Sequence, residues 1–349
     1  MSGSPRTRVI SVHPDDPDLS ALDQAADILT RKGLVAFATE TVYGLGAVAT
    51  EPDAVARIFA AKGRPSINPL IVHVAGVAQA RVCVSEWPDE AGVLASRFWP
   101  GPLTLVLPRS AIIPDIVTAG RSAVGLRCPA GKVPLGLIER CGQPLAAPSA
   151  NRSNRISPTR AEHVLTDLDG RVDLILDSGP TALGLESTVL DLSGISPQLL
   201  RPGPISVAEI EAALGGRSVT TPAAGAAADR PLSPGQLPIH YAPRTPAYRI
   251  ESPDELAGRP ASLDRTALIV VGLANVPGSD RVKVRFHLES PATASQRLYD
   301  VLHRCDEMQP AGILVVMPPD RPEWLAVRDR LIRATRPLAD SERAENSLE

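Results

Sequence analysis

Residues 19–38, LSALDQAADILTRKGLVAFA, contain a complete helix-to-strand unit and indicate the fold class of the chain. Apolar residues recur at helical spacing from Leu19 to Lys32, and Gly33 then stops the helix. Residues 34–38 are all apolar, as is typical of a buried strand. Strands and helices alternate further along the chain, and several strands follow one another closely. The sequence therefore predicts an α/β fold with a mixed, twisted sheet.

More elements are predicted up to residue 214. Thr50 to Asp53 is typical of a capped helix start and predicts a helix that runs to about Ala61. Ser206 to Glu209 predicts a second capped start, with a helix that ends at Leu214. A further helix is expected at 89–98, and strands are expected at 70–74, 103–107, 123–127, 172–176, 187–192 and 198–200.

The chain changes character after residue 214. Residues 215–238 contain almost no large apolar side chains, which indicates a long linker. Strands at 267–272, 282–286 and 312–317, with helices at 292–308 and 322–335, then predict a second α/β domain. The expected organisation is a first domain at 15–214, a linker at 215–243, a second domain at 244–338 and a frayed tail at 339–349.

Composition excludes several classes of protein. The chain has 349 residues, 44% of them hydrophobic, and a net charge of -3, so it is neither disordered nor broadly basic. Its 35 prolines show no collagen period and are therefore expected in functional loops and in the linker. The four cysteines have no metal-ligand spacing. The chain contains no uncharged apolar run of 18 residues, which predicts a cytoplasmic protein that does not contact membranes.

Residues 61–70, AKGRPSINPL, form the first polar segment with a chemical signature. Lys62 alone would be an ordinary cation at a helix C-terminus. Pro65, however, fixes the backbone of the turn and limits the directions that Arg64 can take. A planar, always-charged guanidinium on a stiff loop suits a phosphate or a carboxylate.

Residues 147–159, APSANRSNRISPT, form the second such segment and follow an apolar, strand-like stretch. Hydroxyl, amide and backbone N–H groups before a helix form an anion-binding nest, although most Ser/Asn/Pro runs are only solvated loops. The position after a strand favours the binding site. Together with Arg127 and Arg201, the segment predicts a wide basic cleft for a polyphosphate.

Residues 44–49, GLGAVA, match a dinucleotide-binding fingerprint. The sequence Glu51-Pro52 interrupts the helix that should follow such a fingerprint. A tight glycine turn is therefore the favoured interpretation of this stretch.

Nine short motifs follow one another along the chain: TETVYGLG at 39–46, KGRP at 62–65, NPL at 68–70 with His73, SAN at 149–151, SPT at 157–159, STV at 187–189, LRPG at 200–203, SPG at 233–235 and HYAP at 240–243. In this order they resemble the YrdC-like threonylcarbamoyl-AMP synthase family in its long form. The resemblance covers nearly the whole chain. It implies a YrdC-like mixed sheet with a basic concave cleft and a smaller, Rossmann-like C-terminal α/β domain.

The resemblance also implies a reaction. L-Threonine, bicarbonate and ATP would give threonylcarbamoyl-AMP and pyrophosphate, with Mg²⁺ beside the ATP substrate. The chain would thus be a nucleotidyltransferase of tRNA modification. Separate tRNA threonylcarbamoyl transferase proteins would then move the group to an adenosine beside the anticodon, and a weak contact with tRNA is left open.

Roles of individual residues carry over from matching motif positions. Catalytic roles are expected for Lys62, Arg64, Ser149 and Asn151. Threonine is expected to bind to Thr41, His73, Arg127 and Thr188, with Arg127 on its carboxylate. ATP is expected to bind to Lys62, Arg64, Asn68, Ser149, Asn151, Ser157, Arg201 and Tyr241, and the metal ligands stay open. Strand alternation allows only one of Ser187 and Thr188 to face the site.

The linker and the alternatives complete the prediction. A carbamate reacts with water, so residues 215–243 are expected to fold back as a lid that places Tyr241 on the nucleotide. The rival from another class is an RNA-binding module without catalysis, for which 3 Trp, 4 Tyr and 4 Phe offer few stacking platforms. Carbamoyl transfer in hydrogenase maturation is a second rival, but its zinc-finger cysteines are absent. The second domain could also stabilise or regulate without chemistry of its own.

Overall fold

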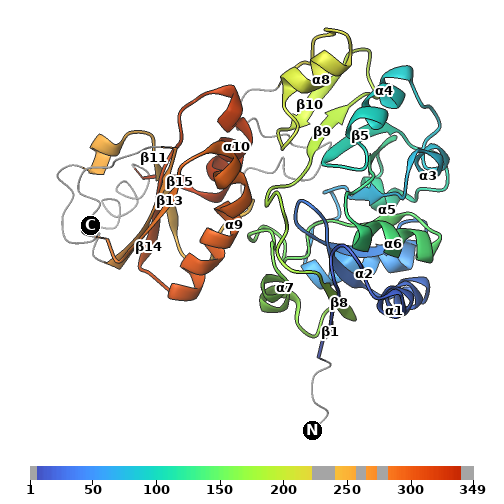
Figure 1. The fold of residues 1–349 in the computed structure, drawn as a ribbon, viewed down its shortest axis with the longest axis horizontal. Coiled ribbons are helices and arrows are strands. Elements are labelled where there is room, and N and C mark those ends of the chain that lie inside the picture. The colour runs from blue at the N-terminus through green and yellow to red at the C-terminus, as the bar shows by residue number, and fades with distance from the viewer. Residues whose placement is uncertain (1–5, 222–239, 257–264, 273–281, 339–349) are drawn as a thin grey trace. The chain divides into compact units, whose positions relative to one another are not determined.

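The computed structural model describes residues 6–221, 240–256, 265–272 and 282–338, and the chain divides into two units (Figure 1). The first unit comprises Met1–Ser153 and Ser157–Leu237. The second comprises Asn154–Ile156 and Pro238–Glu349. Most of the predicted linker and all of the predicted tail at 339–349 lie outside the described residues.

A mixed sheet forms the centre of the first unit. Its strand order is β1-β8-β2-β3-β7-β4-β6-β5-β9-β10, with parallel and antiparallel neighbours. The predicted mixed α/β class is therefore confirmed. The strands are β1 (Arg8–Ser11), β2 (Val35–Ala38), β3 (Tyr43–Val48), β4 (Ile71–His73), β5 (Leu103–Pro108), β6 (Ala123–Arg127), β7 (Leu145–Ala146), β8 (Leu174–Asp177), β9 (Thr188–Asp191) and β10 (Gln198–Arg201).

The helices of this unit mostly begin and end where the local sequence signals predict. Gly63 adopts a left-handed conformation, with φ of 61°, and ends α2. Ser206 and Glu209 form the predicted capping box. The predicted cap at Thr50 is wrong, because the N-cap is Glu51 and no side chain caps α2. The helices are α1 (Leu19–Thr30), α2 (Pro52–Lys62), α3 (Val77–Val82), α4 (Asp89–Phe98), α5 (Asp115–Thr118), α6 (Lys132–Cys141), α7 (Ala161–Leu168) and α8 (Val207–Ala213).

Helices α1 and α6 cover part of one face of this sheet. Apolar side chains of both helices pack against Val35 and Phe37 of β2, Val48 of β3 and Leu145 of β7. The same face of the sheet continues onto β4 and β6. Leu145 of β7 pairs with His73 of β4, and His73 pairs with Arg127 of β6. Paired residues share a face, so His73 and Arg127 lie on the same face as the core under α1 and α6.

Strand β3 differs from the sequence expectation. Gly44 and Gly46 lie inside the strand, not in a tight turn, so that part of the interpretation is wrong. An ideal Cβ at Gly46 would approach the Phe37 ring to 2.8 Å, which explains why this position lacks a side chain. The dinucleotide fingerprint is excluded, since no helix follows these glycines directly. Strand β1 also adds residues before position 15 to the sheet.

The second unit contains a smaller, five-stranded sheet whose strands are all parallel. Its order is β13-β12-β14-β11-β15, and this confirms the predicted second α/β domain. Ser290 caps the N-terminus of the longest helix. The elements are β11 (Ala247–Ile250), β12 (Thr266–Val271), β13 (Val284–Leu288), β14 (Gly312–Val316), β15 (Arg336–Pro337), α9 (Pro291–Met308), α10 (Leu325–Ala334), and the short 3₁₀ helices η1 (Pro253–Leu256) and η4 (Pro322–Trp324).

All four cysteines are reduced and buried. Burial away from water raises the pKa of the Cys83 and Cys128 thiols to about 11 and that of Cys305 to about 12. Burial also raises the pKa of Cys141. None of the helices in the described part of the chain is long and apolar enough to span a bilayer.

Candidate active site

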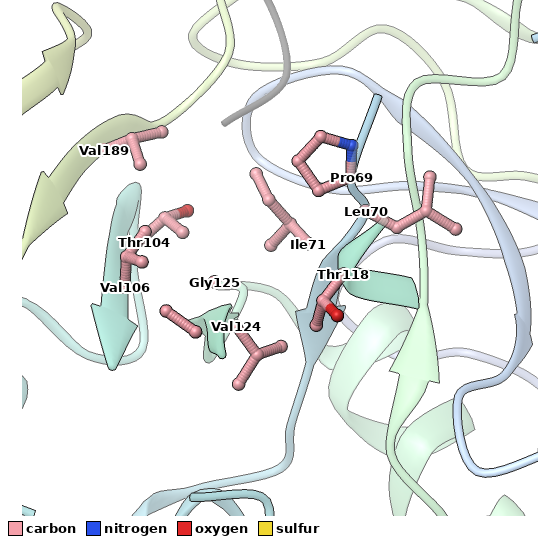
Figure 2. A pocket seen from close by; sticks show the side chains of 10 residues that line it. Pro69, Leu70, Ile71, Thr104, Val106, Thr118, Val124, Gly125 and Val189 are labelled. Atoms are coloured by element: carbon pink, nitrogen blue, oxygen red, sulfur yellow. The ribbon is translucent and has the colours of Figure 1, made fainter. Parts of the chain in front are cut away.

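The predicted site residues of strands β4 and β6 lie on the continuation of the sheet face that α1 and α6 cover. Val106 pairs with Gly125, and Thr104 pairs with Val189, so β5 and β9 contribute to the same face. Figure 2 shows side chains from these strands around a pocket. The pocket is small, with a cavity volume of about 10 Å³, and has room for one water molecule. Its lining includes Ile71, Thr104, Val106, Gly125 and Val189.

Lys62 brings the first two polar segments together. Its ammonium group donates to the backbone oxygen of Ser149 at 2.6 Å, to the backbone oxygen of Asn151, and to Asn151 Oδ1 at 3.4 Å. Ser149 Oγ also donates to Asn151 Oδ1 at 2.5 Å. Among the described residues, no carboxylate forms an ion pair with Lys62, which is 1% exposed. Burial, and secondarily the charge of Arg64, holds the pKa of Lys62 well below its usual value.

The loop after α2 is braced by Arg64. The guanidinium donates from Nε to the backbone oxygen of Asn68 at 3.2 Å and from Nη2 to that of Pro69 at 2.8 Å. Asn68 is fully buried, yet neither polar atom of its side chain has a hydrogen-bond partner among the residues described. A buried amide without hydrogen-bond partners costs free energy in the ligand-free protein. This cost favours the binding of a polar ligand at Asn68.

Arg127, at the end of β6, forms a second buried cluster. Its Nε donates to the backbone oxygen of Gly101 at 3.2 Å, and its Nη1 donates to Thr41 Oγ1 at 2.9 Å. Its Nη2 lies 2.7 Å from Oε1 of Glu40. The structure thus brings the predicted threonine-binding residues Thr41 and Arg127 into direct contact.

His73 lies beside Arg127 in the register of β4 and β6. Burial, and then the positive charge of Arg127, lowers the pKa of His73 to about 3. The imidazole is therefore neutral near pH 7, and its Nδ1 has no hydrogen-bond partner within the described parts of the chain. A neutral ring can donate or accept a hydrogen bond at this atom, so it suits a hydroxyl group.

Strand alternation separates Ser187 from Thr188. Ser187 lies on the face of Thr104, and their hydroxyl oxygens are 2.8 Å apart. Arg201 donates from Nε and Nη2 to the backbone oxygen of Ser187, at 3.1 and 2.9 Å. Thr188 points the other way and exchanges hydrogen bonds with the backbone of Ile205, at 2.8 and 3.0 Å. The structure therefore does not bring the Thr188 side chain to His73 and Arg127.

Two further predicted residues have partners of their own. Ser157 is fully buried and donates to Glu186 Oε1 at 2.5 Å. Tyr241 belongs to the second unit, where its ring stacks on Tyr299 at 5.6 Å and lies 5.3 Å from the guanidinium of Arg330. The roles predicted for Ser157 and Tyr241 in ATP binding stay predictions.

Sequence reasoning missed the polar partners of the predicted residues. Glu40 and Glu186 contact predicted site residues, and so does the Thr104 hydroxyl that meets Ser187. Glu40 lies within the motif at 39–46 that carries the resemblance, and Glu186 directly precedes the motif at 187–189. That proximity was a usable signal. No such signal pointed to Thr104, because its contact with Ser187 depends on the register between β5 and β9.

Comparison with protein families now identifies the chain. A family model of the Sua5, YciO and YrdC proteins, described as "Telomere recombination", matches residues 27–203. A second model, described as "Threonylcarbamoyl-AMP synthase, C-terminal domain", matches residues 205–335. The chain belongs to the two-domain threonylcarbamoyl-AMP synthase family.

Individual members of this family resemble the chain over most of its length. A threonylcarbamoyl-AMP synthase of Bacillus subtilis is 42% identical over 92% of this chain and 93% of its own length. One from Pyrococcus abyssi is 48% identical over 67% of this chain and 69% of its own. The crystal structure of P. abyssi Sua5 complexed with L-threonine has a TM-score of 0.85 and 38% identity, and covers 95% of this chain and 99% of that one. Membership of this enzyme family does not favour the non-catalytic RNA-binding alternative.

Proposed function

We propose that this protein is the threonylcarbamoyl-AMP synthase that the resemblance implies, a nucleotidyltransferase acting on L-threonine, bicarbonate and ATP. The amine of threonine attacks the carbon of bicarbonate, and water leaves to give a carbamate. A carbamate oxygen then attacks the α-phosphorus of ATP, and pyrophosphate leaves. The observation that carries the proposal is the buried ammonium of Lys62, whose hydrogen bonds in the described residues all go to uncharged oxygens and which forms no ion pair with a carboxylate there, so its charge suits a polyphosphate.

In this proposal, the segments around Lys62 bind ATP. Lys62 and Arg64 offset charge on the phosphates as pyrophosphate leaves. The unpaired amide of Asn68 supports a polar contact there. Ser149, Asn151, Ser157 and Arg201 complete the ATP site proposed in the first unit.

Magnesium enters this proposal with the nucleotide. The described residues contain no group of three or more His, Cys, Asp or Glu side chains suited to a metal ion. Mg²⁺ commonly binds to substrate phosphates with one or two carboxylates. ATP phosphates would therefore supply most of its ligands in this site.

Threonine binding falls to the cluster around Arg127. Its guanidinium suits the substrate carboxylate, and the neutral ring of His73 suits the substrate hydroxyl. Thr41 fixes the guanidinium. Of Ser187 and Thr188, Ser187 is the better-supported threonine-binding side chain, because it lies on the same face of the sheet as Arg127. Thr188 would contribute through its backbone. Rate enhancement then comes mostly from holding amine, bicarbonate and α-phosphate together.

The product implies later partners. Threonylcarbamoyl-AMP is an activated acyl group, so a separate transferase must pass it to the adenosine of tRNA. We accordingly propose cytoplasmic action in tRNA modification, where ATP, threonine and tRNA meet.

Pyrophosphate release tests the proposal directly. Release should require both L-threonine and bicarbonate, and omission of either should stop it. The Lys62→Met variant should lose at least 100-fold in turnover. Release that continues without threonine, or none from the intact protein with all three substrates, would contradict the function. An RNA-binding module would give the second outcome.

A further inference from the structure

Glu40 holds three separate segments of the first unit together. Its backbone oxygen accepts from the N–H of Leu183 at 2.8 Å, and its Oε2 accepts from the N–H of Ala130 at 3.0 Å. Its Oε1 lies 2.7 Å from Nη2 of Arg127. The side chains of Glu40 and Arg127 are 13% and 5% exposed, so this is a buried pair of opposite charges.

The pair is close but not aligned. Glu40 Oε1 and Arg127 Nη2 are both buried, and neither has a hydrogen-bond partner in the described residues. The N–H bonds of Nη2 therefore do not point at Oε1, although the two charges attract each other. A donor and an acceptor thus lie side by side, each with hydrogen-bonding capacity left over. Leaving such groups unsatisfied is costly, and this cost favours a ligand that satisfies both.

An α-amino acid satisfies both groups at once. Its carboxylate and its ammonium are attached to the same carbon, so a receptor for it needs a donor and an acceptor next to each other. We propose that Oε1 of Glu40 binds the α-ammonium of the substrate while Arg127 binds its carboxylate. The proposal rests on the function proposed above, in which Arg127 belongs to the threonine site. Glu40 then holds the nitrogen that becomes the nucleophile once the ammonium has released one proton to solvent, which makes Glu40 a catalytic residue.

The alternative is that Glu40 only positions Arg127. The two roles differ in which part of the substrate they affect. Positioning alone would weaken every ligand that uses the carboxylate site. Direct contact weakens only ligands that carry the amine. A threonine analogue without its amine, 3-hydroxybutanoate, separates the two.

Calorimetric titration of the full-length protein measures both ligands without turnover. In the unaltered protein, 3-hydroxybutanoate should bind at least tenfold more weakly than L-threonine, because it cannot use the charge of Glu40. The Glu40→Gln variant keeps an acceptor for the N–H of Ala130 and should bind threonine at least tenfold more weakly. Its dissociation constant for 3-hydroxybutanoate should stay within twofold. Glu51→Gln, at a half-exposed carboxylate paired with Lys32, should change neither constant.

Equal weakening of both ligands in Glu40→Gln would overturn direct contact and leave positioning only. Unchanged threonine binding would also overturn the proposal. If Glu40→Gln does not fold, the unaltered protein decides the question, since equal binding of the two ligands there excludes a role for the amine. Failure of the proposed function is distinguishable, because it appears as missing pyrophosphate release in the unaltered protein, whatever the titrations give.

Discussion

Arg64 illustrates how a residue can serve both a loop and a reaction. Its Nε and Nη2 brace the backbone at Asn68 and Pro69, and its charge lies close enough to lower the pKa of Lys62. Two neighbouring buried cations repel each other until an anion binds. The pair is therefore expected to act on the charge that develops as pyrophosphate leaves.

Arg64→Ala should lower kcat by at least 100-fold, because it removes a cation from the phosphate site. Steady-state pyrophosphate release at saturating ATP measures this effect. The control is Arg57→Ala, at a half-exposed arginine paired with Asp173, which should keep normal turnover. Normal kcat in Arg64→Ala, with only a raised KM for ATP, would show that Arg64 binds ATP without acting on the transition state.

His73 makes stability depend on pH. Its pKa of about 3 in the folded protein lies below the ordinary value of 6.5, so the unfolded chain binds the proton more readily. Stability should therefore fall as the pH drops below about 6.5, by up to about 1.4 kcal/mol for each pH unit from this group. Denaturant unfolding at pH 7 and pH 5 measures the difference.

His73→Asn should reduce this loss between pH 7 and pH 5, because asparagine does not titrate. His13→Asn serves as the control, since His13 is exposed and should leave the loss unchanged. An equal loss in His73→Asn and in the unaltered protein would mean that other groups cause the acid sensitivity.

At the scale of elements, close approach of two segments shapes the region around Ser187. An ideal Cβ on Gly203 would lie 2.3 Å from the backbone nitrogen of Thr188 and 2.8 Å from the backbone oxygen of Glu186. Backbone atoms cannot rotate away as a side chain can. Only glycine therefore lets the loop after β10 pack against the start of β9.

Gly203→Ala should lower Tm by at least about 2 °C, because overpacking against backbone costs about 1–3 kcal/mol or more. Gly194→Ala is a matched control: no atom lies within 4 Å of its ideal Cβ, and its Tm should change by less than about 1 °C. Calorimetry of the two variants measures both values. A Gly203→Ala protein as stable as the control would show that the two segments can separate at little cost.

Elements with a strong local pattern could be predicted from the sequence. The helix at 19–30 and the strand at 35–38 follow apolar periodicity, and Ser206 caps α8 as its capping box predicts. Strand β3 could not be recognised, because its two glycines read as a turn until Phe37 is known to pack on Gly46. The choice between Ser187 and Thr188 also needs the sheet register. The sequence could show that they face opposite ways, but not which way.

At the scale of the whole molecule, the predicted lid at 215–243 follows α8, the last described helix of the first unit. The lid falls mostly outside the described residues. Its role follows from chemistry alone, since a carbamate reacts with water unless water is excluded. The candidate site described in the first unit contains Lys62 and Arg127. Substrate binding can therefore be tested separately from the protection of the carbamate against water.

A protein that ends at Leu214 should still bind L-threonine but should release pyrophosphate at least tenfold more slowly, because water reaches the carbamate. A protein that ends at Leu338 is the control and should keep full activity. Pyrophosphate release and calorimetric titration measure the two properties. Full activity in the shorter protein would rule out a lid. Loss of threonine binding as well would show that the removed residues help to form the site.

The burial of all four thiols has a practical consequence for such experiments. Thiols with raised pKa values carry little thiolate near neutral pH and are slow to react with maleimide or iodoacetamide reagents. A single new cysteine at an exposed position, such as Ile195 at 95% exposure, would therefore be modified selectively. A fluorophore attached there could then report ligand binding to the first unit while the four native thiols stay unmodified.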